Sequence, residues 1–184
     1  MQVWKIKINN SKTQSILFPY NNSERLNPPQ NCKIQIAENS VDWSEEVVYL
    51  GLTFDRKLIF RTQIDKTRTK CQILLKKLYP MISRNSRLSL VNKSAVYKQI
   101  VLPVILYGSP IWDSCARIHK KKLQIIQNKF LRMIYNLSRY TRVTTIHEIA
   151  EIKTIEEKLV EIKRKFIEKS QISEHEIIRG LFPH

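Results

Sequence analysis

The spacing of apolar residues changes near residue 58, and this change constrains the fold more than any other feature of the sequence. Before it, polar stretches with Asn and Pro separate short runs rich in β-branched and aromatic residues, which are VWKIKIN, QSILFPY, CKIQIA and VVYLGLTF. Such runs are typical of strands. After it, apolar residues recur every three or four positions, as in helices. The sequence therefore predicts an α+β chain, in which short N-terminal β-strands are followed by a mainly α-helical domain.

Two prolines limit the first two predicted helices. Proline lacks the N–H that a helix interior uses, so the first helix, from about residue 59, is expected to stop near Pro80. The second is expected from about Ser89 through Leu102, where Pro103 must end or kink it. The buried face predicted for the first helix consists of Ile64, Thr67, Cys71, Leu74, Leu75 and Leu78.

The remaining helices are predicted from one apolar stripe and two capping patterns. A third helix is predicted over about residues 115–135. Four apolar residues recur there at helical spacing, Leu123, Ile126, Phe130 and Ile134. In a capping box, a Ser or Thr is followed three residues later by a Glu that bonds back to the first residue. Two such boxes predict the starts of two C-terminal helices, Thr154 with Glu157 and Ser173 with Glu176.

Positive charge is concentrated in the middle of the chain. The whole sequence has 32 Lys and Arg against 16 Asp and Glu, for a net charge of +16. Residues 1–60 and 146–184 are nearly balanced, so the excess lies in residues 61–145, whose only acids are Asp65 and Asp113. Such a segment favours a polyanionic partner, either nucleic acid or anionic lipid. The alternative is a basic face that is only solvated.

Other classes of protein are disfavoured by the cysteines, histidines and apolar runs. Cys32, Cys71 and Cys115 lie far apart with no Cys-x-x-Cys pattern, so neither a disulfide framework nor a zinc site is indicated. His147 is predicted to pack locally. The longest apolar run, residues 100–108, is much shorter than the roughly 20 residues that span a bilayer. We therefore expect an intracellular protein of the nucleus or cytoplasm that is not secreted and has no membrane partner.

Five segments, taken in order, resemble a known family. They are INNSKTQSILF, VVYLGLTFDRKLIFRTQI, VLPVILYGSPIW, LQIIQNKFLRMI and TTIHEIAEI, and they lie between residues 8 and 152. Together they resemble consecutive landmarks of the reverse transcriptase of jockey-type non-LTR (LINE-like) retrotransposons. The resemblance implies the C-terminal part of that RNA-directed DNA polymerase. Residues 1–58 would be a partial palm with motifs D and E, residues 59–152 a basic helical thumb and connection, and residues 153–184 C-terminal amphipathic helices.

The same resemblance implies roles for two palm motifs. Asn-x-x-Lys-Thr at residues 9–13 would be motif D, with Lys12 facing the triphosphate and assisting the departure of pyrophosphate. Tyr49, Leu50 and Gly51 would be motif E, the primer grip, a hairpin whose backbone supports the 3′ end of the primer. A glycine inside an apolar run is typical of a bulge or of a close approach by another backbone. For Gly51, both interpretations stay open here.

Nucleic-acid binding in the helical region is expected from cations on the third predicted helix. Its basic residues are Lys120, Lys121, Lys122, Lys129 and Arg132. We expect these side chains to contact phosphates of an RNA–DNA or DNA duplex. The Lys120–Lys122 run is also compatible with a solvated helix face or a weak nuclear-import signal.

The chain departs from the family's pattern in its carboxylates. Polymerase chemistry needs at least two neighbouring carboxylates to hold two metal ions, and this sequence has no Asp-Asp pair. In the family, the metal-binding aspartates precede motif D, which places them before residue 1. We expect no cofactor in this chain and no activity from it alone. Mg²⁺ is expected for the full-length enzyme, and a further partner would be the missing N-terminal half with palm and fingers.

Two functions remain open at this point. In the first, the chain is a fragment of a reverse transcriptase that contributes template-primer binding. In the second, it is a stand-alone basic helical module that binds nucleic acid or another anionic partner and has no role in polymerisation.

Overall fold

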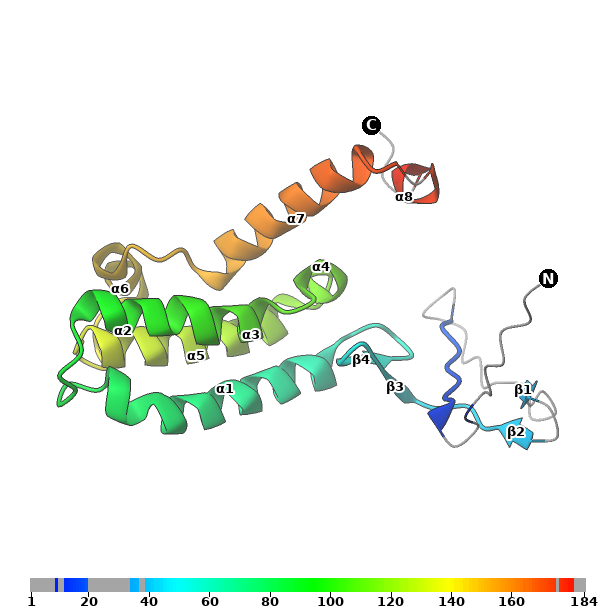
Figure 1. Cartoon of the computed structure of the whole chain (residues 1–184), viewed down its shortest axis with the longest axis horizontal. Coiled ribbons are helices and arrows are strands. Elements are labelled where there is room, and N and C mark those ends of the chain that lie inside the picture. Colours follow the sequence, from blue (N-terminus) through cyan, green and yellow to red (C-terminus); the bar gives the residue numbers. More distant parts are fainter. Residues whose placement is uncertain (1–8, 10–11, 20–33, 37–38, 175, 181–184) are drawn as a thin grey trace, which may run out of the picture. The chain divides into compact units, whose positions relative to one another are not determined.

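The computed structural model describes residues 9, 12–19, 34–36, 39–174 and 176–180, and it is shown in Figure 1. The chain divides into two compact units, residues 1–60 and residues 61–184. Short strands in the first and helices in the second confirm the predicted α+β class. The predicted strand VWKIKIN lies outside the described residues, except for its last residue, Asn9.

The first unit contains two antiparallel hairpins. Strand β1 (Ile34–Ile36) pairs with β2 (Asn39–Val41), and β3 (Glu46–Tyr49) pairs with β4 (Leu52–Asp55). The strand predicted for QSILFPY is wrong over its described part, because Ser15 forms only an isolated bridge with Trp43. Strand β2, in contrast, lies in a polar stretch predicted as a linker. Strands this short are determined by pairing more than by composition.

The apolar run at residues 47–54 is not one strand but the hairpin β3–β4. Tyr49 pairs directly with Leu52, which leaves Leu50 and Gly51 as a two-residue turn. Their φ angles are 47° and 77°. Positive φ at both central positions is the type I′ geometry that fits the twist of a hairpin, and glycine adopts it without steric cost. Gly51 is therefore a turn residue and not a bulge within a strand.

The described residues of the second unit form helices joined by short loops, and no strand. Its elements are α1 (Arg61–Ile82), α2 (Leu90–Val96), the π-helical turn η2 (Tyr97–Val101), α3 (Leu102–Leu106), α4 (Ser109–Trp112), α5 (Arg117–Ile134), α6 (Val143–Ala150), α7 (Ile155–Gln171) and α8 (Glu176–Gly180). Helix α5 is central, because α1, α2, α6 and α7 all pack against it. None of the described helices is both long and apolar enough to cross a membrane.

Helix α1 ends near Pro80, as predicted, whereas the helical path continues past Pro103. Helix α1 continues through Pro80 to Ile82, since a proline in the last turn removes only one backbone hydrogen bond. Pro103 lies inside α3, directly after the π-helical turn. There the N–H of Leu102 bonds to the carbonyl of Tyr97, five residues back. The wider turn accommodates the missing N–H of Pro103, so α2, η2 and α3 follow one another without a break.

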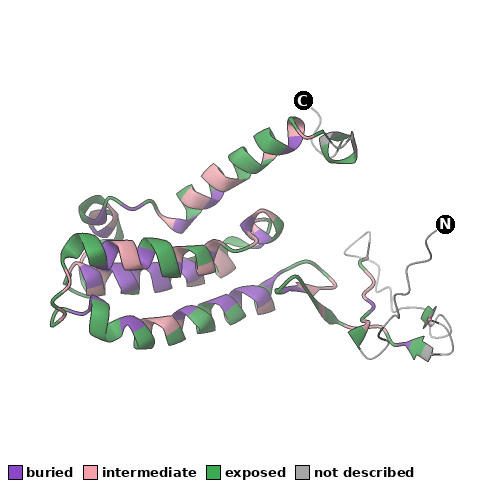
Figure 2. Cartoon of the chain, viewed as in Figure 1, coloured by how far each residue is buried: buried purple, intermediate pink, exposed green. Residues whose placement is uncertain are grey.

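The core of the second unit forms around α5, where the ribbon in Figure 2 is coloured largely as buried. All four residues of the predicted α5 stripe are buried. The ring of Phe130 lies 5.8 Å from the ring of Tyr97. The other helices contribute further buried side chains, among them Ile64, Cys71, Val101, Ile105, Trp112, Ile146, Ile155 and Leu159. Leu74 and Leu75 of the predicted α1 face are only half-buried.

Candidate nucleic-acid interface

The two acids of the basic segment are both paired with lysines of α5. Lys122 Nζ lies 2.6 Å from Asp65 of α1, and Lys120 Nζ lies 2.7 Å from Asp113. The Lys122 bond lowers the pKa of the Asp65 carboxyl. Lys120 and Lys122 therefore join α5 to neighbouring elements. Between them, Lys121 is exposed and makes no ion pair within the described part of the chain.

Arg132 makes an internal contact, as Lys120 and Lys122 do, whereas Lys129 faces solvent, as Lys121 does. Arg132 is half-buried, and its Nη2 donates to the carbonyl of Thr141 at 3.2 Å. Its Nε is buried without a hydrogen-bond partner among the described residues. Arg132 thus holds the loop that follows α5, whereas Lys129 is exposed. Of the five predicted cations, the structure places Lys121 and Lys129 toward solvent and uses the other three in internal contacts.

The solvent face of α5 is both cationic and apolar. Ile118, Lys121, Ile125 and Lys129 follow one another at spacings of three and four residues, so they share one face. Ile118 is 67% exposed and Ile125 is 56% exposed. We call these four residues the α5 stripe. The alternating isoleucines and lysines provide both apolar contact area and charge, a combination that suits a nucleic-acid backbone with its sugars.

Helix α1 presents a second cationic face. Its buried residues lie on one side, and its exposed side carries Lys66, Arg68, Lys70, Lys76 and Lys77. The helix packs against α5, and the Asp65–Lys122 pair lies between the two helices. The cations of α1 and α5 therefore belong to one helix pair.

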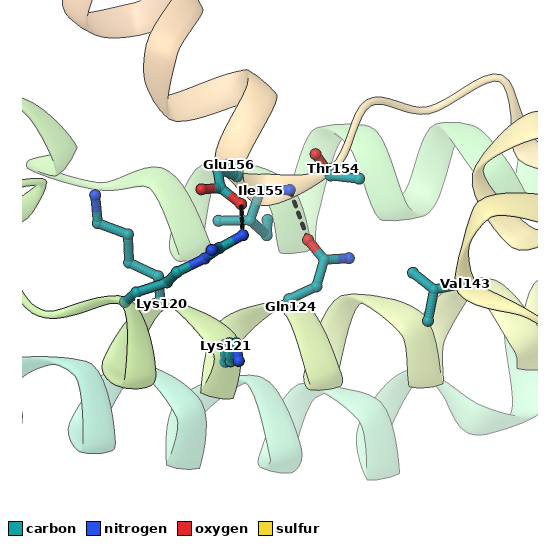
Figure 3. Close-up of a pocket in the computed structure, with 8 residues that line it drawn as sticks. Lys120, Lys121, Gln124, Val143, Thr154, Ile155 and Glu156 are labelled. Atoms are coloured by element: carbon teal, nitrogen blue, oxygen red, sulfur yellow. Dashed lines mark hydrogen bonds and ion pairs between the residues drawn. The ribbon is translucent and has the colours of Figure 1, made fainter.

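A pocket of about 220 Å³ opens beside the first turn of α7 (Figure 3). Arg117, Lys120 and Lys121 contribute cations to its lining. Glu156 lines it as well and lies 3.6 Å from Arg117, so the pocket's own carboxylate partly neutralises it. The pocket is thus not an open anion site.

A polar network on α5 holds the link between α6 and α7. Gln124 Oε1 accepts from the N–H of Ile155 at 2.8 Å, and Gln124 Nε2 lies 2.9 Å from His147 Nε2. His147 Nδ1 lies 2.7 Å from the carbonyl of Ile152, to which it donates. The predicted local packing of His147 therefore holds for its contact with Ile152, but its other ring nitrogen contacts Gln124, 23 residues before it. The network itself was not predicted, because its partners lie up to 31 residues apart in sequence.

The residues predicted to form motifs D and E lie in the first unit. The carbonyl of Asn9 accepts from the N–H of Lys12 at 3.1 Å and from Thr13 Oγ1 at 3.0 Å. This turn explains the Asn-x-x-Lys-Thr spacing and leaves Lys12 exposed. Tyr49 and Leu50, at the hairpin tip, are 65% and 73% exposed. The tip thus presents an aromatic and an apolar side chain to solvent.

The carboxylates and thiols of the described residues do not form a metal centre. No group of three or more His, Cys, Asp or Glu there could hold a metal ion. Asp55 instead accepts from the N–H groups of Ile59 and Phe60, at 2.9 and 2.6 Å. Cys71 and Cys115 are buried, and burial raises the pKa of the Cys71 thiol to about 11. These residues do not fit the two-metal site of a polymerase.

Comparison with known proteins identifies the relatives of the chain. It is 36% identical over 152 residues to the probable RNA-directed DNA polymerase from transposon X-element of Drosophila melanogaster, a match that covers 83% of this chain. It is 28% identical over 180 residues, or 98% of the chain, to the corresponding protein from transposon BS of the same organism. The chain is homologous to part of the polymerases of jockey-type non-LTR retrotransposons.

The jockey polymerases themselves match nearly the whole chain. The RNA-directed DNA polymerase from mobile element jockey of Drosophila funebris is 27% identical over 179 residues. These matches span only 16–19% of the length of the curated relatives. No protein-family model and no solved structure matches the chain. The homology confirms the predicted family.

Proposed function

We propose that the chain is the C-terminal part of a jockey-type reverse transcriptase and contributes template-primer binding, while the catalytic aspartates belong to a part of the enzyme outside this sequence. The observation that carries the proposal is the 36% identity over 83% of the chain to an RNA-directed DNA polymerase. The proposal accounts for the lack of an Asp-Asp pair in this sequence. In this proposal, residues 59–152 act as the thumb and connection.

In this proposal, the α5 stripe and the cations of α1 contact phosphates of the duplex. Lys121 and Lys129 are exposed, so they can neutralise phosphates without losing an internal ion pair. Phosphate contacts position a protein on a duplex but carry no sequence information. Binding should therefore show little sequence preference and a steep dependence on salt.

In the first unit, Lys12 would stabilise negative charge on the departing pyrophosphate. The exposed tip formed by Tyr49, Leu50 and Gly51 would support the primer strand. Both roles require the remainder of the polymerase, since a leaving-group contact alone does not generate a nucleophile.

The test is the salt dependence of duplex binding by the full chain. If about six phosphates are neutralised, log K should fall with log salt at a slope of about −5. Changing Lys121→Gln and Lys129→Gln together should make the slope shallower by roughly 2, because each lost contact removes about 0.9. A matched control is Lys163→Gln with Lys169→Gln, two exposed lysines of α7 outside the basic segment.

If the α5 variant and the α7 control change the slope equally, only net charge matters and the proposed interface is wrong. Circular dichroism should show that both variants stay folded, because all four side chains are exposed.

A further inference from the structure

The loop between α5 and α6 has a defined shape. Helix α5 ends with a bond from the N–H of Leu137 to the carbonyl of Arg132 at 2.9 Å, and Asn136 has a φ of 53°. This pattern is a Schellman C-cap, with Asn136 in the left-handed position. The helix therefore stops at a fixed point, and residues 138–142 follow it in a determined direction.

Internal hydrogen bonds then fold these residues into a tight turn. The N–H of Thr141 donates to the carbonyl of Ser138 at 3.1 Å, and the N–H of Tyr140 donates to Ser138 Oγ at 3.3 Å. Arg132 secures the turn from α5 through its bond to the carbonyl of Thr141. Arg139 and Tyr140 consequently occupy the two central positions of the turn, where side chains project outward.

The tip presents an aromatic ring with cations around it. Tyr140 is 80% exposed. The guanidinium carbon of Arg139 lies 4.9 Å from the centroid of the Tyr140 ring. Arg139 and Arg142 are both exposed, and the sequence contains no acid between Asp113 and Glu148. A tyrosine in contact with a cation is a stacking surface within a positive field.

Such a surface suits an unpaired base better than a duplex. Bases inside a duplex already stack on both faces, so the Tyr140 ring could stack only on an unstacked base or a strand end. Single-strand binding sites combine aromatic rings for bases with cations for the backbone. Trp112 does not offer the same surface, because it is buried and its Nε1 donates to the carbonyl of Tyr107 at 2.8 Å. The ring of Tyr107 is less exposed than that of Tyr140, at 57% against 80%.

We propose that the 138–142 loop binds an unpaired nucleotide of a single-stranded nucleic acid. The Tyr140 ring stacks on the base, and Arg139 and Arg142 contact the flanking phosphates. The inference rests on the proposed function, because it takes nucleic acid as the partner. It adds a second site, for a single strand, and duplex binding through the α5 stripe does not depend on that site.

The test compares two probes with the full chain. One is a short single-stranded oligonucleotide with a central 2-aminopurine, whose fluorescence falls when the base stacks. The other is a covalently closed circular duplex, which has no strand ends. Wild-type chain should quench the single-stranded probe. Tyr140→Ala should abolish the quenching and weaken single-strand binding roughly tenfold, whereas Tyr140→Phe should keep both. Duplex binding should be unchanged in either variant.

Phe166→Ala serves as a matched control, because Phe166 is an exposed aromatic residue on α7, outside the basic segment. Arg139→Gln and Arg142→Gln should each make the salt slope of single-strand binding shallower by roughly 0.7. If Tyr140→Ala binds and quenches the single strand like wild type while the duplex still binds, the loop site is wrong and the proposed function stands. If wild-type chain binds neither probe, both proposals fail.

Discussion

Among single residues, Gly51 has the clearest conformational reason for its identity. Its φ of 77° and the φ of 47° at Leu50 define a two-residue hairpin turn. This local geometry requires no approaching partner. A role in the primer grip would therefore come from the exposed tip as a whole, and it can be separated from the conformational role of the glycine.

Gly51→Ala should destabilise the β3–β4 hairpin by about 1 kcal/mol, because a Cβ at positive φ clashes with the backbone. Gly51→Asn should cost less, since Asn tolerates the left-handed region. Amide hydrogen exchange of the hairpin measures both effects. If Gly51→Asn keeps the hairpin protected but weakens primer binding, close backbone approach also matters. Equal protection in Gly51→Ala and wild type would contradict the turn argument.

Among the helices and strands, α7 has the most completely defined start. The N–H of Thr154 donates to Glu157 Oε2 at 2.7 Å, and the N–H of Glu157 donates to Thr154 Oγ1 at 3.2 Å. The bonds from Thr154 lower the pKa of the Glu157 carboxyl. The capping box predicted from sequence is confirmed. The other predicted box differs, because α8 begins at Glu176 itself and not directly after Ser173.

Thr154→Ala should lower the free energy of unfolding by about 1 kcal/mol. The contribution of Glu157 should depend on pH. Because its folded-state pKa lies below 4.5, the ionised carboxylate stabilises the fold above that pH, and the contribution disappears as pH falls through the lowered value. Thermal unfolding of Glu157→Gln at pH 7 and pH 3 measures this. Glu148→Gln, at an exposed residue of α6, is the control.

The Glu157→Gln variant should be less stable than wild type at pH 7 and should approach it at pH 3. A difference in melting temperature that stays the same at both pH values would show that the carboxylate charge is not involved.

For the whole molecule, the distribution of charge matters more than its total. The excess of cations lies in the described helices of the second unit, whereas carboxylates that could activate a nucleophile form no cluster within the described residues. In the proposed function, this distribution assigns duplex binding to the second unit and leaves nucleotidyl transfer to the rest of the polymerase.

We predict that the isolated chain does not extend a primer on an RNA template in the presence of all four deoxynucleotides and Mg²⁺ or Mn²⁺. The physical reason is that Lys12 can assist a leaving group but cannot replace the metal ions that activate the 3′ hydroxyl. A gel-based extension assay, with heat-denatured chain as control, is the measurement. Extension above that control would contradict the prediction.

Features encoded over a few residues were predictable from the sequence. The change from strand to helix near residue 58, the buried stripe of α5 and the capping box of α7 all depend on residues two to four positions apart. The family could also be recognised from short segments in order. Each of these signals is local, so the chain displays it before any tertiary contact forms.

Only the tertiary structure decided which polar residues are available for binding. In sequence, Lys120, Lys121 and Lys122 are equivalent, but Asp65 lies 57 residues before Lys122 and pairs with it once α1 packs on α5. Chain distance likewise conceals the bond between Gln124 and His147, which are 23 residues apart. Whether a charged side chain faces solvent or forms an ion pair depends on which helices pack together. The physical reason is that ion pairs and hydrogen bonds act over a few ångströms of space, whatever the separation along the chain.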